Sequence, residues 1–258
     1  MKARELQHYI GSQVPVWQVE EGFRFGDPDA EVTGILVCWM ITLQAIERAI
    51  TEGCNLILTH EDLFYPYNFQ RADTLEPHLH WAVNRHRISA LARGGLTVFR
   101  AHGALDRICI FDDFAALLDL GEPERSDGVY GKVYRVLPTS MGEVAARVKQ
   151  CLGLATVRTC GDPCRRVSLV GLPWGGMGLS LNIGYVNSLL EMGSDLLIAG
   201  ETDEYAMRYV LDAGAVMIET GHALSEEPGL SHFAERLRQQ FPGVKVVFVS
   251  CGPAWRPL

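Results

Sequence analysis

The sequence predicts an α/β fold with two similar halves, each a mixed, largely parallel sheet flanked by helices. Three stretches repeat one pattern, in which a helix with apolar residues at helical spacing is followed by a glycine and a short apolar strand. Alternation of helices with short apolar strands is typical of this fold class. The three stretches cover residues 45–59, 185–199 and 205–219, and further strands are predicted over residues 32–39, 96–101, 167–170 and 244–249.

The first repeat predicts a helix over residues 45–52, because its apolar residues recur at helical spacing. Gly53 is expected to end this helix, since glycine readily adopts the left-handed conformation that closes many helices. The apolar run over residues 55–59 then predicts a buried strand, which leads directly into His60 and Glu61.

The second and third repeats also place ionisable residues after their strands. The predicted strand over residues 195–199 leads to Glu201, and the one over residues 215–219 leads to His222. In open, largely parallel sheets, ligands bind beyond the carboxyl ends of the strands. The ionisable side chains that follow these strands are therefore expected at a binding edge. The preceding helices are predicted over residues 185–192 and 205–212, ended by Gly193 and Gly214.

Charge and composition exclude several classes of protein. The chain has 23 Lys and Arg against 31 Asp and Glu, a net charge of −8, and its basic residues cluster only briefly. A local anion site is compatible with this pattern, but no nucleic-acid partner is expected. The 7 cysteines are odd in number and lie mostly in apolar runs, which favours reduced thiols. No signal peptide or membrane span is predicted. We expect a cytoplasmic protein.

Donors for divalent metal ions occur in three separate segments. Carboxylates and neutral imidazoles offer electron pairs to such ions at neutral pH. His60 and Glu61 follow one strand, Asp106 follows another, and His222 and Glu226 are four residues apart, which places them on one face of a helix. The sequence thus predicts a metal-binding α/β domain over residues 1–125 and 215–258, and a second α/β domain over residues 126–214.

Each donor also has an ordinary structural alternative. A single His-Glu pair is more often part of a solvated loop, and an Asp after a strand frequently caps the next helix. The pair of His222 and Glu226 is equally compatible with a surface hydrogen bond. His102 lies close to Asp106 in the sequence, and it is interpreted either as a partner that orients a ligand or as a packing residue.

Three other features are given structural interpretations. The glycine-rich stretch over residues 171–178 could cradle a phosphate, but it lacks the lysine of a P-loop, so a structural turn is preferred. The Cys160 and Cys164 spacing without a second pair is a weak zinc signal, and a turn between strands is expected there. The histidines His78, His80 and His86 could form a secondary metal site, but we expect them to line a partly exposed helix instead.

Four segments resemble the NIF-three-like family, also catalogued as GTP cyclohydrolase I type 2 homologues. DAEVTGILV at residues 29–37 is similar to the family's entry into its first long strand, and LILTHED at residues 56–62 resembles the family's LIITHH. AHGALD at residues 101–106 is similar to HTNLD, and TGHALSE at residues 220–226 resembles GHYxSE. The resemblance covers nearly the whole chain.

The resemblance implies two divalent ions that share a carboxylate. Glu61, Asp106 and Glu226 would bind one ion, and His60, His222 and Glu226 the other. Where the family has paired histidines this chain has His60 and Glu61, and the extra carboxylate favours Mn, Mg or Fe over Zn. The resemblance also implies a toroidal homo-oligomer, commonly a hexamer, with metal sites facing an internal cavity.

Two functions follow as hypotheses. The first is a metal-dependent hydrolase acting on a small nucleotide or phosphoester, in which two ions activate a water, Glu226 bridges them, and Glu201 or His102 carries protons. By resemblance the reaction would be of the GTP cyclohydrolase kind. The alternative is a metal-binding scaffold or adaptor without catalytic activity.

Overall fold

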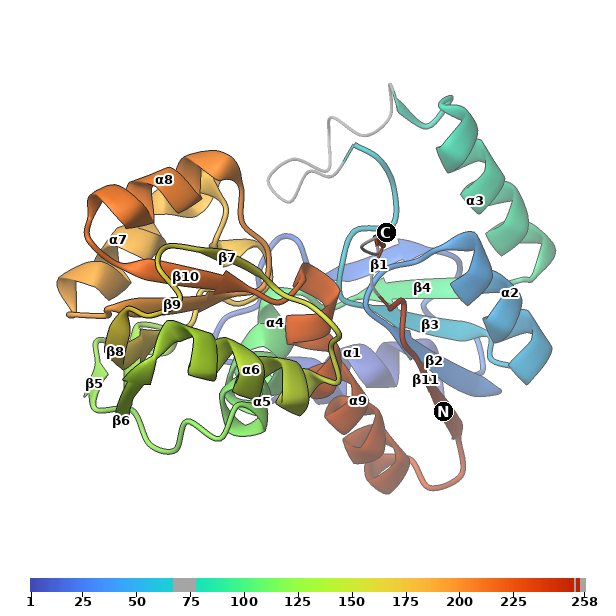
Figure 1. The fold of residues 1–258 in the computed structure, drawn as a ribbon. Helices are drawn as coiled ribbons and strands as arrows, with labels where there is room; N and C mark the ends of the chain where they lie inside the picture. Colours follow the sequence, from blue (N-terminus) through green and yellow to red (C-terminus); the bar gives the residue numbers. More distant parts are fainter. Residues whose placement is uncertain (67–77, 253, 256–258) are drawn as a thin grey trace. The chain divides into compact units, whose positions relative to one another are not determined.

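The structure is a computed structural model that describes residues 1–66, 78–252, 254 and 255 (Figure 1). The chain forms two compact units. Unit 1 comprises Met1–Cys109 and Gly229–Cys251, and unit 2 comprises Ile110–Pro228 with the C-terminal residues from Gly252. Residues 215–258 are assigned to the metal-binding domain from the sequence, and the predicted domain bounds stay a prediction. In the structure the strand at residues 216–219 lies in unit 2, where it pairs with the strand at residues 196–199.

Unit 1 is built on a five-stranded sheet in the order β1-β4-β3-β2-β11. Four of these strands run parallel to one another, namely β11, β2, β3 and β4. Strand β1 pairs with β4 and is antiparallel to it. The elements are α1 (Ala3–Gly11), β1 (Gly22–Phe25), β2 (Gly34–Cys38), α2 (Leu43–Glu52), β3 (Leu56–Thr59), α3 (Ala82–Arg93), β4 (Thr97–Arg100), the short α4 (Gly103–Leu105) and β11 (Lys245–Val249).

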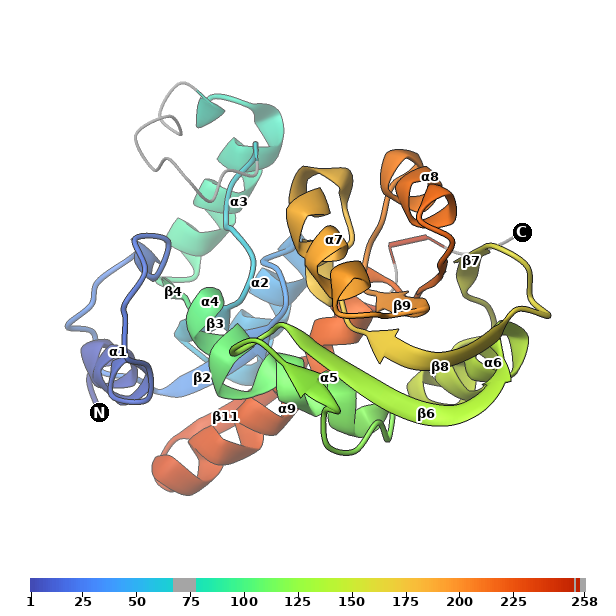
Figure 2. The same ribbon diagram turned by 90° about the vertical axis from the view of Figure 1, so that its left-hand side faces the viewer.

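Unit 2 is built on a six-stranded mixed sheet in the order β5-β6-β8-β9-β10-β7, with β8, β9 and β10 parallel. Helices α7 and α8 cover one face of this sheet and α6 covers the other (Figures 1 and 2). The elements are α5 (Phe111–Leu117), β5 (Arg125–Ser126), β6 (Lys132–Ser140), α6 (Met141–Leu152), β7 (Arg158–Cys160), β8 (Arg166–Gly171), η4 (Gly175–Met177), η5 (Ser180–Asn182), α7 (Ile183–Glu191), β9 (Leu196–Ala199), α8 (Glu204–Asp212) and β10 (Val216–Glu219).

At two places the boundary between the units falls within a helical element. The π-helical turn η3 (Asp106–Ile110) begins in unit 1, and α9 (His222–Gln240) begins in unit 2 and ends in unit 1. Among the described residues, no helix has both the length and the apolar composition that a membrane crossing requires.

The first predicted repeat forms as expected from its sequence. Thr42 caps α2 by accepting a hydrogen bond from the backbone N–H of Ala45, and Gly53 ends the helix in the left-handed conformation with φ of 70°. The apolar face of α2 packs against the sheet, where Ile46 and Leu36 share a buried cluster. Strand β3 is buried along its whole length, so it places residue 60 at a defined position.

Replacement of Gly53 tests this helix end. We expect Gly53→Ala to lower the free energy of unfolding by about 1–2 kcal/mol, because a left-handed backbone brings the added Cβ close to the following carbonyl. Gly243→Ala in the same unit is the control, since that glycine has no positive φ and no atom within 4 Å of an added Cβ. Urea denaturation measures both, and equal stabilities would contradict the expectation.

Candidate metal site

The parallel strands of unit 1 place histidines at neighbouring strand ends. Strand β3 leads to His60 and β4 leads to His102, after Ala101 has donated a backbone hydrogen bond of 3.0 Å to Thr59. The pairing of β3 with β4 is in parallel register. The imidazole rings of the two histidines therefore lie side by side, with centroids 4.6 Å apart.

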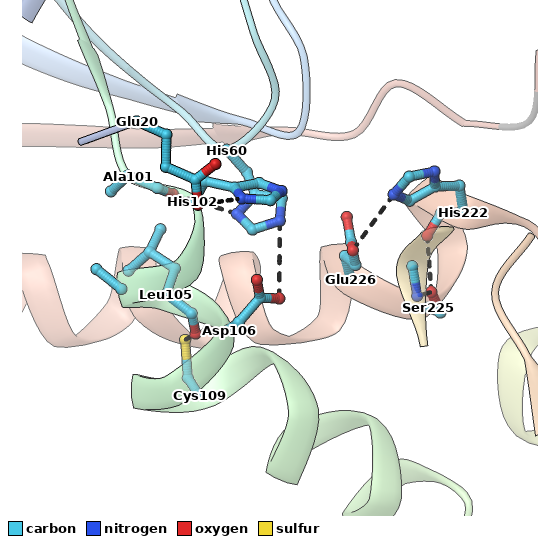
Figure 3. Close-up of polar contacts among 12 residues, drawn as sticks. Glu20, His60, Ala101, His102, Leu105, Asp106, Cys109, His222, Ser225 and Glu226 are labelled. Atoms are coloured by element: carbon cyan, nitrogen blue, oxygen red, sulfur yellow. Dashed lines mark hydrogen bonds and ion pairs between the residues drawn. The ribbon is translucent and has the colours of Figure 1, made fainter. Parts of the chain in front are cut away.

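One hydrogen bond determines which nitrogen of His60 is available as an electron-pair donor. Nδ1 lies 3.2 Å from the carbonyl oxygen of Ala101 (Figure 3). Because a carbonyl oxygen only accepts, Nδ1 is the protonated nitrogen of the neutral ring and Nε2 holds the lone pair. Nε2 lies 3.8 Å from Oδ1 of Asp106. Two electron-pair donors that face each other in a buried position suit a cation between them.

Nδ1 of His102 also lies beside an acceptor. Its Nδ1 lies 2.9 Å from Oε1 of Glu20, a carboxylate that orients the ring (Figure 3). Burial is the largest single influence and lowers the pKa of His102, but the hydrogen bond with Glu20 and the negative charges of Asp106 and Glu61 together outweigh it, so the pKa is raised. His60, His102 and Asp106 each offer a ligand atom, and these three atoms lie within 4.8 Å of one another. The group could therefore hold a metal ion.

Glu61 adds a second carboxylate to unit 1. It is buried, and one of its oxygens lies within 4.8 Å of a ring nitrogen of His60. Its backbone N–H donates to the carbonyl of Trp39 at the end of β2, with a distance of 2.7 Å. The buried guanidinium of Arg100 donates to the carbonyl of His60 at 3.2 Å and lies 3.9 Å from Oδ2 of Asp62.

Unit 2 repeats the arrangement of a histidine between an acceptor and a carboxylate. His222 follows β10 and begins α9, and its Nδ1 lies 2.9 Å from Oε2 of Glu201, which follows β9. The Nε2 of His222 lies 3.4 Å from Oε1 of Glu226, one helical turn further along α9 (Figure 3). Glu201 thus orients the ring, and Nε2 and the buried carboxylate of Glu226 are directed at each other.

The glycine-rich loop after β8 packs against these donors. The N–H of Gly175 donates to Oγ of Ser225 at 2.9 Å, and its carbonyl accepts from the N–H of Glu201 at 2.7 Å. Gly175 has φ of +50°, and a Cβ there would lie 1.9 Å from Oε1 of Glu226. The loop contains the 3₁₀ turn η4, and its close approach to Glu226 requires glycine at position 175.

The structure brings together most of the predicted residues within each unit. His60, Glu61 and Asp106 are neighbours in unit 1, and His222, Glu226 and Glu201 are neighbours in unit 2. The assignment of these ligands to one pair of ions stays a prediction, as does proton transfer by Glu201 or His102. The geometry also indicates another role for each of these two residues. Glu201 orients the ring of His222, and His102 offers a ligand atom.

Two functional candidates, Glu20 and Glu21, were not predicted. Both contact residues 102–104, and the only signal in the sequence is that the two acids are adjacent. The turn predicted at Cys160 and Cys164 is confirmed, since it joins β7 to β8. Of the other histidines, His86 lies exposed on α3 and His78 and His80 precede that helix.

Comparison with known proteins shows the family to which the chain belongs. A model of the Duf34/NIF3 (NGG1p interacting factor 3) family matches residues 1–253. The chain belongs to this family. It is 27% identical over 249 residues to the GTP cyclohydrolase 1 type 2 homolog of Lactococcus lactis, covering 94% of this chain and 92% of the relative. The resemblance found in the sequence is confirmed.

Solved structures of the NIF3 superfamily share the fold. The Staphylococcus aureus hypothetical protein SA1388 matches with a TM-score of 0.82 at 18% identity, covering 100% of this chain and 99% of the other. A Bacillus cereus protein related to NIF3 matches with a TM-score of 0.80 at 13% identity, also covering 100% and 99%. The α/β class with two mixed sheets is confirmed.

Substitution of Gly175 tests the link between the glycine-rich loop and metal binding in this NIF3 family member. We expect Gly175→Ala to weaken the binding of divalent ions by at least about 10-fold. Substitutions of residues that hold a metal ligand in place typically lower the affinity by this factor or more. The added methyl group would displace the carboxylate of Glu226. Isothermal titration with Mn²⁺ measures the affinity.

Gly184→Ala is the matched control for this substitution. Gly184 lies on α7 in the same unit, and an added Cβ there meets no atom within 4 Å. Its affinity for Mn²⁺ is expected to equal that of the unaltered chain. Equal affinities for all three proteins would show that Glu226 does not depend on the loop.

Proposed function

We propose that this chain binds two divalent metal ions and hydrolyses a small nucleotide or phosphoester. One observation supports the proposal most strongly, namely that three histidines each have Nδ1 beside an acceptor, which leaves Nε2 as the electron-pair donor. In two of them Nε2 faces a carboxylate, at 3.8 Å and 3.4 Å. Neutral imidazoles with a fixed tautomer and carboxylates are suitable ligands for Mn²⁺, Fe²⁺, Mg²⁺ or Zn²⁺.

The proposal keeps the ligands predicted from the sequence, which are His60, Glu61, Asp106, His222 and Glu226. Bound divalent ions would supply a Lewis acid that activates water. The chain's own contribution is to orient the imidazoles, with Glu201 holding His222 and the carbonyl of Ala101 holding His60. Curated relatives bear the name GTP cyclohydrolase 1 type 2 homolog, which favours a nucleotide as the first substrate to test.

The variant Glu226→Ala tests the enzymatic function. We expect the metal-loaded protein to hydrolyse GTP or bis(p-nitrophenyl) phosphate, and the variant to lose more than about 100-fold of this turnover. The loss of a ligand should exceed the effect of losing an outer partner, which is about 10–100-fold. Glu204→Ala, which removes an exposed glutamate of the same unit, is the control.

The same assay distinguishes the enzyme from a metal-binding scaffold. Retained binding of two ions without turnover of either substrate would favour the scaffold. Equal turnover by Glu226→Ala and the unaltered chain would contradict a role of this carboxylate in catalysis.

We also propose that the chain forms a homo-oligomer, as its family resemblance implies. Native mass spectrometry should find six copies of the 28.6 kDa chain in one particle. A monomer as the single species at micromolar concentration would contradict this assembly.

A further inference from the structure

We infer that Glu20 and Glu21 form a clamp that positions His102 as a further metal ligand of unit 1, beside His60 and Asp106. The inference rests on the metal binding proposed above and extends it to a histidine outside the predicted set. It follows from the contacts of residues 18–21 with residues 102–104, which are about eighty positions away in the sequence.

Glu20 fixes the imidazole ring of His102. Its Oε1 accepts a hydrogen bond from Nδ1 at 2.9 Å, and both side chains are largely buried, with 11% and 20% exposure. A carboxylate bound to Nδ1 selects the tautomer whose lone pair is on Nε2 and makes that nitrogen a stronger donor. The ring is therefore held in the form that a metal ion binds.

Glu21 fixes the backbone that carries the ring. Its Oε2 accepts from the N–H of His102 and its Oε1 from the N–H of Ala104, both at 2.8 Å. The backbone of His102, with φ of −101° and ψ of −92°, is neither helical nor extended. Its carbonyl accepts from the N–H groups of Leu105 and Asp106, and its own N–H donates to Glu21. One carboxylate thus replaces the backbone hydrogen bonds that a strand or helix would supply.

Gly103 packs against the segment that precedes Glu20. A Cβ on this residue would lie 2.9 Å from Nε2 of Gln18, so the loop before Glu20 packs tightly against the chain that follows His102. Neither segment is free to move away from the other without losing this packing and the three hydrogen bonds.

The clamp brings His102 into a group with the geometry of a metal site. Ligand atoms of His60, His102 and Asp106 lie within 4.8 Å of one another, and the two rings are inclined by 31°. All three residues belong to unit 1, so the unit offers two imidazoles and one carboxylate by itself. Three donors of this kind form the protein part of many divalent metal sites.

The first measurement is made on the metal-free, unaltered chain. Histidine ¹⁵N NMR should show His102 protonated at Nδ1 with the lone pair on Nε2. In Glu20→Ala this preference should weaken, while Glu20→Gln should retain it, because the amide oxygen still accepts from Nδ1. A resonance for His102 in the opposite tautomer would overturn the clamp, whether or not the protein binds metal.

The second measurement compares metal binding among variants of the full chain. With Co²⁺ as the probe, Glu20→Ala should bind about 10–100-fold more weakly than the unaltered chain, and Glu20→Gln should recover part of the loss. His102→Ala should also change the visible absorption bands of bound Co²⁺, since a nitrogen donor is lost. Glu47→Gln, an exposed glutamate on α2 of the same unit, is the control and should bind normally.

The outcomes separate this inference from the proposed function. If the unaltered chain binds Co²⁺ and His102→Ala binds it with the same affinity and the same spectrum, His102 is not a ligand and the inference is overturned, while metal binding stands. If the unaltered chain binds no divalent ion at all, the proposed function fails.

Discussion

The hydrogen bond at Nδ1 of each histidine is the interaction on which the metal-binding geometry depends. In His60 the acceptor is a backbone carbonyl, in His102 it is Glu20, and in His222 it is Glu201. An imidazole without such an acceptor would exchange between two tautomers and rotate about its Cβ–Cγ bond. With the acceptor in place, each ring offers one nitrogen in one direction.

These acceptors are in place because the strands are parallel and short. In unit 1 the end of β3 lies beside the end of β4, so the carbonyl of Ala101 reaches the ring of His60. In unit 2 the end of β9 lies beside the end of β10, which brings Glu201 to His222. The same principle of parallel strand pairing therefore builds both groups of donors.

Much of the fold could be predicted because five of the described parallel strands, β2, β3, β4, β9 and β10, are buried along their whole length. Such strands are continuous apolar runs, and glycines end the preceding helices, so the predicted bounds of α2, β3, α7 and α8 lie within two residues of those observed. The antiparallel strand β6 was missed. Its antiparallel pairing with β8 cannot be read from the local sequence, and this pairing is interrupted between Arg135 and Thr139, around Pro138.

The sequence singles out candidate donors, but it singles out the residues that orient them only in part. Glu201 follows a recognisable strand, and the sequence therefore singled it out. Glu20 and Glu21 lie in a stretch without periodic apolar residues, and they reach His102 only through the folded chain. The pairing of β10 with β9, which lies in unit 2, is likewise a property of the sheet and not of the local sequence.

Anomalous X-ray diffraction from crystals grown with Mn²⁺ or Zn²⁺ tests the central claim most directly. Anomalous peaks are expected about 2.0–2.2 Å from Nε2 of His60 and from Nε2 of His222, with carboxylate oxygens of Asp106 and Glu226 at similar distances. Peaks beside Nδ1 of these histidines, or no peak near either ring at saturating metal, would contradict it.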